Sequence, residues 1–361
     1  MKKIFLMVAV MAVTSLWAGV SLDQKIGQML MVGFHGTSAP KNSRICQDIR
    51  KYHIGAVILF DYNPVDKSKP KNIASRKQLK KLTAQLQKCS YDGKLLIAVD
   101  QEGGKVQRLK RKYGFYGNFP KASDVTRMDK KQIKKTYRKM AKELKSVGIN
   151  YDLAPVVDLD INPKNHVIHG LGRSFGKDPK TVAAYASTFI DAMHHYGVLT
   201  SLKHFPGHGS SVGDTHKGFV DVTNLWKRVE LEPYRLLNRK ADTVMVAHVF
   251  NKKLDARYPA SFSNRTVNGI LRKQLGFNGV VITDDLQMGA ISKKYGLKNT
   301  LKLAINAGDD ILLFGNQLDP RKTVSTKKLV ETIKSLLKRG EVNPKSIDYA
   351  YIRIQNLKRK L

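Results

Sequence analysis

Cysteine is scarce in this sequence, since only Cys46 and Cys89 occur among its 361 residues. Two cysteines exclude the dense disulfide frameworks of small secreted domains. They leave two alternatives open: an exported protein could pair them, and they could equally be free and buried.

Long hydrophobic runs are also lacking, because no stretch approaches the roughly 20 apolar residues that cross a bilayer. The apolar run at 4–13 follows Met1-Lys2-Lys3 and leads to Ala18. A short positive end, an apolar segment and a small residue at its exit are typical of a secretory signal peptide. The alternative is a buried N-terminal strand or helix. We expect a leader over 1–18 and an exported, periplasmic mature protein over 19–361 that does not insert into the membrane, with secretion from the cell as the alternative.

Carboxylates are few: Asp and Glu number 29 against 64 Lys and Arg, and the formal net charge is +35. This charge favours an anionic setting such as nucleic acid, acidic lipid or an anionic wall polymer. The basic residues are nevertheless scattered through every segment, and a solvated basic surface explains them as well. No nucleic-acid-binding motif accompanies the charge, so we expect no nucleic-acid partner.

Short aliphatic and β-branched runs alternate along the chain with segments of helical period. The runs that predict strands are 27–34, 55–60, 95–100, 151–160, 197–205, 243–250, 279–285 and 310–314. The segments that predict helices are 74–89, 130–148, 179–197, 264–276, 297–308 and 326–340. Eight buried strands alternating with helices indicate parallel βα units. We expect one α/β domain, a (β/α)₈ barrel with an irregular early strand. An open doubly wound sheet is the alternative, weakened because no G-x-G-x-x-G follows the first strand.

Polar side chains follow most of these predicted strands. They are Asp100, Asp158, Asp160, Lys203, His204, His248, Asp284 and Asp285. Because active sites of such barrels lie at the carboxyl ends of the strands, we expect these side chains to meet at one mouth.

The segment "KHFPGHGSSVGDTH" (203–216) is too polar and too rich in glycine to be core. Asp214, two residues before His216, could orient the imidazole for general acid/base catalysis. A zinc set including His204 and His208 is the alternative. It is weak, because Pro206 and Gly207 prevent the helix that would bring these two histidines onto one face, so we expect no metal.

The pair Asp284-Asp285 ends a predicted strand. A carboxylate there could be a nucleophile, a general base or a metal ligand, whereas one of the two could simply cap the next helix. Asp100, Arg108 and Arg173 lie on glycine-flanked loops, where they could hold an oxygen-rich ligand. A phosphate-loop interpretation is weak, because no G-K-[ST] ending is present.

Together, "KHFPGHG", "DTH", "VDQEGGKVQR" (99–108), "GRSFG" (172–176) and "TDDLQM" (283–288) resemble glycoside hydrolase family 3, in its bacterial β-N-acetylglucosaminidase branch. The resemblance extends from about residue 22 to residue 361. Two features depart from the family pattern: D-S-H reads D-T-H, and 164–172 is longer and richer in histidine.

The resemblance implies a (β/α)₈-type barrel and a retaining mechanism without a cofactor. Asp284 matches the nucleophile, His216 the acid/base and Asp214 the residue that orients it. Five residues match positions that bind the sugar: Asp100, Arg108, Arg173, Lys203 and His204. We also expect Lys203 and Arg173 to keep Asp284 ionised by opposite charge.

These matches predict an exo-β-N-acetylglucosaminidase that removes terminal N-acetylglucosamine from peptidoglycan fragments through a covalent glycosyl-aspartate. Another β-glycosidase or a phosphorylase is the alternative among enzymes. A catalytically inactive carbohydrate-binding barrel would not need Asp284 together with the Asp214–His216 pair. The sequence does not determine the oligomeric state.

Overall fold

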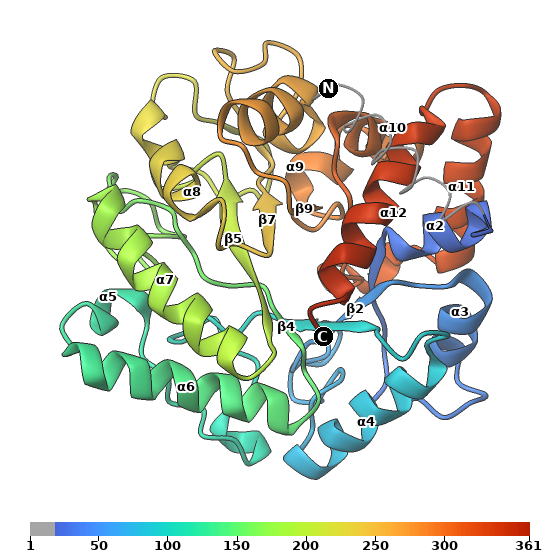
Figure 1. Ribbon diagram of the computed structural model, residues 1–361, viewed down its shortest axis with the longest axis horizontal. Helices are drawn as coiled ribbons and strands as arrows, with labels where there is room; N and C mark the ends of the chain where they lie inside the picture. Colours follow the sequence, from blue (N-terminus) through green and yellow to red (C-terminus); the bar gives the residue numbers. More distant parts are fainter. Residues whose placement is uncertain (1–18) are drawn as a thin grey trace, which may run out of the picture.

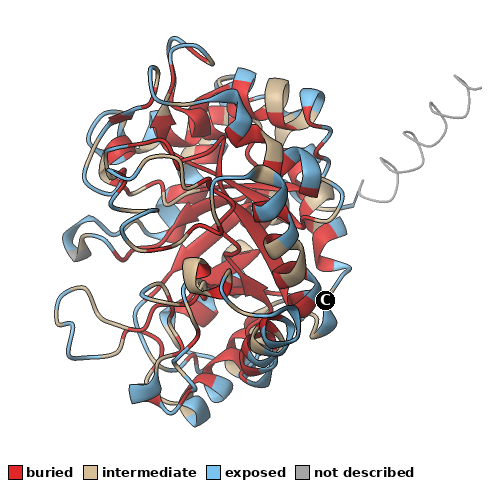
Figure 2. Ribbon diagram, turned by 90° about the vertical axis from the view of Figure 1, so that its left-hand side faces the viewer, coloured by how far each residue is buried: buried red, intermediate tan, exposed pale blue. Residues whose placement is uncertain are grey.

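The computed structural model describes residues 19–361, so the expected leader lies outside the described residues. Eight parallel strands form one sheet at the centre of a ring of helices (Figure 1). The strands are β1 (Leu30–Gly33), β2 (Ala56–Ile58), β3 (Leu96–Val99), β4 (Tyr151–Asp152), β5 (Leu199–Phe205), β7 (Thr243–Val246), β9 (Val280–Thr283) and β10 (Leu312–Phe314). All of their residues are buried (Figure 2), as expected for a parallel sheet covered by helices.

The sheet closes into a barrel. Its strand order is β10-β1-β2-β3-β4-β5-β7-β9, and the two end strands meet through a parallel bridge between Ile282 and Ile311. The N–H of Thr283 donates to the carbonyl of Ile311 at 3.0 Å across the same seam. The predicted (β/α)₈ class is therefore confirmed.

The surrounding helices begin where side chains can satisfy their free N–H groups. Ser75 caps α4 and Asp129 caps α6, each with a glutamine three residues later that completes a capping box. The helices are α2 (Leu22–Gln28), α3 (Arg44–Tyr52), α4 (Arg76–Cys89), α5 (Ala122–Val125), α6 (Lys130–Ser146), α7 (Pro179–His195), α8 (Glu232–Leu237), α9 (Gly289–Ser292), α10 (Gly296–Ala307), α11 (Thr326–Lys338) and α12 (Pro344–Lys358). No helix of the described chain has the length and apolar character needed to cross a membrane.

Three predicted elements differ from the structure. The strand expected at 151–160 is limited to β4 and a single bridge from Val156 to Lys203, because Pro155 has no N–H for the ladder. The strand expected at 243–250 divides into β7 and the short β8 (Val249–Phe250), which pairs with β6 (Val220–Asp221).

The helix expected at 264–276 is a π-helix, η4 (Arg265–Gln274). The N–H of Leu275 closes it on the carbonyl of Ile270, five residues earlier. Helical period in the sequence does not distinguish this wider turn from an α-helix.

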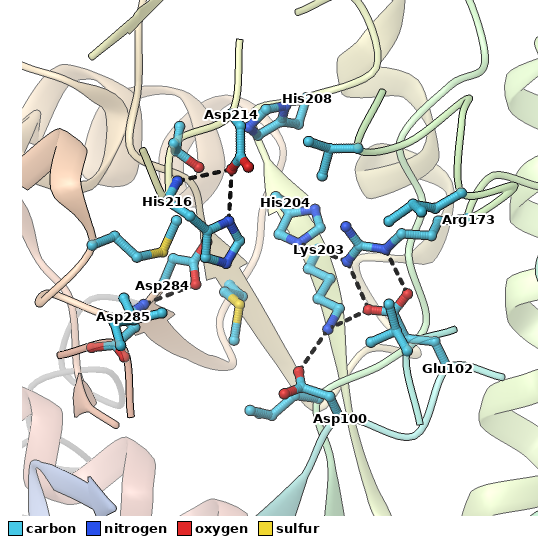
Figure 3. A pocket seen from close by; sticks show the side chains of 18 of the residues that line it. Asp100, Glu102, Arg173, Lys203, His204, His208, Asp214, His216, Asp284 and Asp285 are labelled. Atoms are coloured by element: carbon cyan, nitrogen blue, oxygen red, sulfur yellow. Dashed lines mark hydrogen bonds and ion pairs between the residues drawn. The ribbon is translucent and has the colours of Figure 1, made fainter. Parts of the chain in front are cut away.

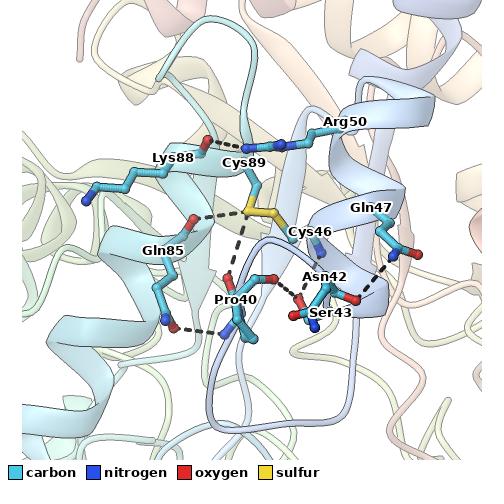
Figure 4. Close-up of a disulfide and its surroundings, with 10 residues drawn as sticks. Pro40, Asn42, Ser43, Cys46, Gln47, Arg50, Gln85, Lys88 and Cys89 are labelled. Atoms are coloured by element: carbon cyan, nitrogen blue, oxygen red, sulfur yellow. Dashed lines mark hydrogen bonds between the residues drawn. A yellow bond between two sulfur atoms is a disulfide. The ribbon is translucent and has the colours of Figure 1, made fainter.

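A disulfide joins Cys46 on α3 to Cys89 at the end of α4 (Figure 4). Their Cα atoms lie 5.2 Å apart, although 43 positions separate the two cysteines in the sequence. The bond links two neighbouring helices of the ring. Of the two alternatives left open by the sequence, the cysteines are therefore paired and not free.

Replacing both cysteines by serine is expected to lower the free energy of unfolding by about 3–4 kcal/mol, because the unfolded chain loses a closed loop of this length. Urea titration of the wild type and the double variant measures the difference. Reduction of the wild type with dithiothreitol should shift its curve toward that of the variant. A variant as stable as the oxidised wild type would contradict this account.

Candidate active site

A cavity of about 600 Å³ opens at the carboxyl ends of the barrel strands. All eight site residues predicted from the sequence line it. They are Asp100, Arg108, Arg173, Lys203, His204, Asp214, His216 and Asp284. Seven strands or the connections that follow them supply the cavity wall, so the fold brings together predicted site residues up to 184 positions apart in the chain.

One side of the cavity is a buried ion-pair network centred on Glu102 (Figure 3). Arg173 binds both oxygens of Glu102, with Nε–Oε2 at 2.8 Å and Nη2–Oε1 at 2.7 Å. Lys203 Nζ lies 2.7 Å from Glu102 Oε1 and 3.0 Å from Asp100 Oδ1, while Arg108 donates to the other oxygen of Asp100 at 3.0 Å. Each cation is thereby held in place before any ligand arrives.

Burial alone would raise the pKa of Glu102, but the charges of Arg173 and Lys203 outweigh it and lower the pKa to about 2. The expectation that Lys203 and Arg173 keep Asp284 ionised by opposite charge is wrong, because both cations pair with Glu102 and histidines lower the pKa of Asp284 instead. Glu102 follows β3 within a motif that the sequence singled out, yet nothing in the sequence distinguishes a hub of ion pairs from a loop carboxylate.

Asp284 lies at the end of β9 on the opposite side of the cavity (Figure 3). Its Oδ1 accepts a hydrogen bond from the backbone N–H of Asp285 at 2.8 Å. Burial would raise the pKa of Asp284, but His248, His204 and His216, together with this N–H, lower it below its usual value. The carboxylate is therefore ionised at neutral pH, as a nucleophile requires.

The carboxylate of Asp285 is held by backbone N–H groups. Its Oδ1 accepts from the N–H groups of Gln287 at 3.0 Å and Gly315 at 3.2 Å, and burial raises its pKa to about 6. The interpretation that one aspartate of the pair caps the next helix is wrong, because Met288 occupies the N-cap of α9 and makes no side-chain bond there. Asp285 instead joins the end of β9 to the chain after β10.

His216 and Asp214 form the pair that their spacing predicted. Asp214 Oδ1 accepts from the backbone N–H of His216 at 2.9 Å and lies 2.8 Å from the imidazole Nδ1. Partial burial would raise the pKa of Asp214, but these two bonds lower it. The other edge of the imidazole faces the cavity next to Asp284 (Figure 3), and the side chain is 53% exposed, which leaves Nε2 available to a ligand.

Asp158, six residues after the end of β4, positions His204 and His208. Its Oδ2 lies 2.7 Å from His204 Nδ1, and its Oδ1 accepts from the N–H of His208 at 2.7 Å. Arg173 can only donate, so at 3.4 Å it makes His204 Nε2 the acceptor and Nδ1 the protonated nitrogen. The sequence placed Asp158 at the mouth but gave it no role.

The histidine-rich segment 164–172 forms a wall of the cavity through His166, Val167 and Leu171. The buried Asn165 fastens it to the loop that carries His216, donating to the carbonyl of His208 at 2.8 Å and lying 3.1 Å from that of Gly209. The two loops therefore form one packed unit.

In residues 19–361 no three His, Cys, Asp or Glu side chains are grouped so that they could hold a metal ion. The rings of His204 and His208 lie edge to face with centroids 5.9 Å apart, and their Nδ1 atoms have different partners, Asp158 and Ser211.

Residues 21–357 match the family model described as "Glycosyl hydrolase family 3 N terminal domain". The chain belongs to glycoside hydrolase family 3. It is thus a glycoside hydrolase, and the cavity described above is its candidate active site.

Several named proteins are similar in sequence to this family 3 chain. It is 36% identical over 277 residues to beta-hexosaminidase LpqI of Mycobacterium tuberculosis, covering 73% of this chain and 68% of the relative. It is 33% identical over 296 residues to a beta-hexosaminidase of Stenotrophomonas maltophilia, covering 79% and 82%.

Solved structures of the family superpose closely. A beta-N-acetylhexosaminidase from Beutenbergia cavernae gives a TM-score of 0.81 at 30% identity, covering 95% of this chain and 99% of that one. A family 3 beta-N-acetylglucosaminidase from Paenibacillus sp. gives 0.81 at 31% identity. The superposed region covers 95% of this chain and 63% of the Paenibacillus protein.

Glu102→Gln is expected to raise KM and to lower the free energy of unfolding by about 3 kcal/mol, because it leaves Arg173 and Lys203 buried with less compensating charge. Glu341 is a matched control, since it also contacts three cations, Lys298, Lys302 and Arg339, but at the surface. Steady-state kinetics and thermal unfolding of both variants measure the effect. Equal losses in Glu102→Gln and Glu341→Gln would show that burial of the network has no importance.

Proposed function

We propose that this family 3 glycoside hydrolase is a retaining exo-β-N-acetylglucosaminidase. The observation that carries the proposal is the single cavity shared by the ionised Asp284 and the Asp214-bound imidazole of His216. Retaining hydrolysis needs a nucleophile and a proton donor on either side of the scissile bond. The names of the relatives, beta-hexosaminidase and beta-N-acetylglucosaminidase, support the sugar specificity.

In the proposed mechanism Asp284 attacks the anomeric carbon while the protonated His216 donates its proton to the departing glycosidic oxygen. The aglycone leaves as an alcohol, and the sugar remains bound to Asp284 as a glycosyl ester. Neutral His216 then removes a proton from water, which attacks the same carbon and releases the carboxylate. Two inversions give net retention, and the acetamido group is bound without acting as nucleophile.

The sugar hydroxyls and the acetamido group are bound, in this proposal, by the network on the other wall. Asp100 and His204 present acceptors, whereas Arg108, Arg173 and Lys203 present donors whose positions are set by ion pairs before binding. Side chains held in this way lose little conformational freedom when the sugar arrives, which favours binding.

The proposed substrates are peptidoglycan fragments with terminal N-acetylglucosamine, and the proposed compartment is the periplasm. The net charge of +35 suits a glycan that carries carboxylates. The Cys46–Cys89 disulfide supports an oxidising compartment, where such bonds persist.

Labelling of the nucleophile tests the mechanism. After incubation with a 5-fluoro N-acetylglucosaminyl fluoride, which slows breakdown of the glycosyl-enzyme, mass spectrometry is expected to find the sugar on the peptide that contains Asp284. The Asp284→Ala variant serves as the unlabelled control. A label on any other peptide would exclude Asp284 as nucleophile.

A further inference from the structure

The outer faces of α4 and α6 carry a set of lysines without carboxylate partners. Eleven exposed lysines lie on these two helices: Lys77, Lys80, Lys81, Lys88, Lys130, Lys131, Lys134, Lys135, Lys139, Lys142 and Lys145. None of the eleven forms an ion pair with any carboxylate of residues 19–361. We call this set the α4–α6 lysine face.

The two helices also lack exposed carboxylates of their own. α4 contains no acidic residue, and the one acidic residue of α6, Glu143, is buried and paired with Arg76. Two of the four lysines of α11 behave differently, since Lys327 pairs with Glu331 and Lys334 pairs with Asp23. The charge on α11 is therefore neutralised in part, whereas none of the eleven lysines on α4 and α6 has a carboxylate partner.

The first half of α4 meets the carboxyl end of α6. Arg76 at the start of α4 donates to Ser146 at the end of α6 at 3.0 Å, and Thr83 in the middle of α4 donates to the carbonyl of Val147 at 2.7 Å. In Figure 1 they occupy neighbouring sectors in the ring of helices. At 1.5 Å per residue, their 14 and 17 residues make the two helices about 20–25 Å long.

One exposed aromatic side chain lies within this face. Tyr116 is 39% exposed, Lys139 Nζ lies 3.1 Å from its ring centroid, and its backbone N–H donates to Glu143 at 3.1 Å. The exposed residues of α4 and α6 include no large aliphatic or aromatic side chain. The face can therefore attract anions strongly but cannot insert deeply into an apolar medium.

We propose that the α4–α6 lysine face binds the surface of an anionic phospholipid membrane. Lysine is a compact point charge that suits a layer of phosphate head groups, whereas recognition of individual phosphates or bases favours the planar fork of arginine. Tyrosine beside lysine is the pairing that occupies the boundary between head groups and water. Each lysine near such a surface strengthens binding about fivefold.

Binding through this face leaves the cavity accessible. The face lies on the flank of the barrel, while the cavity opens at the carboxyl ends of the strands. A membrane against α4 and α6 would run alongside the barrel axis, so substrate could still enter at the mouth. The proposal thus concerns where the protein is retained and not how it cleaves.

Cosedimentation with phospholipid vesicles tests the proposal. The mature chain is expected to bind vesicles of phosphatidylglycerol mixed with phosphatidylcholine and to stay in solution with phosphatidylcholine alone. Binding should weaken steeply between 50 and 300 mM sodium chloride, because the attraction is screened.

A pair of variants with equal net charge separates this face from total charge. Lys80→Gln, Lys81→Gln, Lys135→Gln and Lys142→Gln together should lower the partition coefficient by on the order of 10²–10³-fold. The matched control replaces four exposed lysines elsewhere, which also lack ion pairs: Lys252, Lys253, Lys338 and Lys345. The control should bind within a few-fold of the wild type, and circular dichroism and thermal unfolding establish that both variants are folded.

Three outcomes would overturn the proposal. The first is absence of wild-type binding to anionic vesicles at low salt. The second is an equal loss in both quadruple variants, which would assign binding to total charge. The third is displacement of the wild type from vesicles by an equal phosphate concentration of duplex DNA, which would identify a nucleic-acid surface. None of these readouts depends on the glycosidase activity, so they remain valid if the proposed function fails.

Discussion

Asp284→Ala is expected to lower kcat/KM for p-nitrophenyl N-acetyl-β-glucosaminide by at least about 10⁴-fold, since loss of a nucleophile removes the whole covalent route. The fold should be kept, because the backbone pairing of β9 with β7 does not depend on this side chain, although the N–H of Asp285 loses its bond to Asp284 Oδ1. Release of p-nitrophenol, followed at saturating and subsaturating substrate, measures the effect. The expected loss is in kcat, with a smaller change in KM.

Asp160→Ala is the matched control, because Asp160 also follows a barrel strand, β4, but is not among the residues that line the cavity. It should retain nearly full activity. Azide added to Asp284→Ala should restore turnover and yield the α-glycosyl azide, since a single displacement inverts the anomeric centre. A variant with wild-type activity, or a β-configured azide product, would remove Asp284 from the role of nucleophile.

His216→Ala is expected to lower kcat/KM for an N-acetylglucosamine disaccharide by about 10²–10⁴-fold, the usual contribution of a general acid. The loss in kcat/KM should be far smaller for an aryl substrate, dinitrophenyl N-acetyl-β-glucosaminide, because dinitrophenolate departs without a proton. The quantity to compare is kcat/KM, which reports the first displacement alone. Azide should rescue turnover of the aryl glycoside and yield the β-glycosyl azide.

His169→Ala provides a control of unusually close geometry. His169 Nδ1 lies 2.8 Å from Asp160 Oδ1, the same separation as His216 Nδ1 from Asp214 Oδ1, but His169 does not line the cavity. In this variant kcat/KM should be unchanged for both substrates. Equal losses on the disaccharide and the aryl glycoside in His216→Ala would indicate a structural and not a proton-donating role.

The positions of the catalytic candidates could be predicted because they depend on local pattern. Asp100 and Asp284 directly follow short aliphatic runs, and the strand that each run forms delivers its terminal carboxylate to the mouth. The Asp214–His216 pair is equally local, since a spacing of two residues suffices for the bond between them. Motif and period were therefore adequate for the placement of these residues.

The partners of these residues depend on contacts across the barrel. Glu102 pairs with Lys203, which lies 101 positions later in the sequence, and Asp158 binds His204 and His208 from the following strand and loop. The expectation that Lys203 keeps Asp284 ionised was wrong for this reason. Its nearest carboxylates in the folded protein are Asp100 and Glu102. The extent of β4 and the π-helical turn of η4 likewise depended on packing.

By itself the sequence determined the number and order of the βα units and which side chains end the strands, because both follow from a periodicity that local residues satisfy. Only the tertiary structure decided which charges pair, that Cys46 meets Cys89, and that the start of α4 meets the end of α6. These outcomes depend on distances between segments far apart in the chain, which a local sequence pattern does not contain. Burial then makes the interaction energy of two charges strongly dependent on such distances.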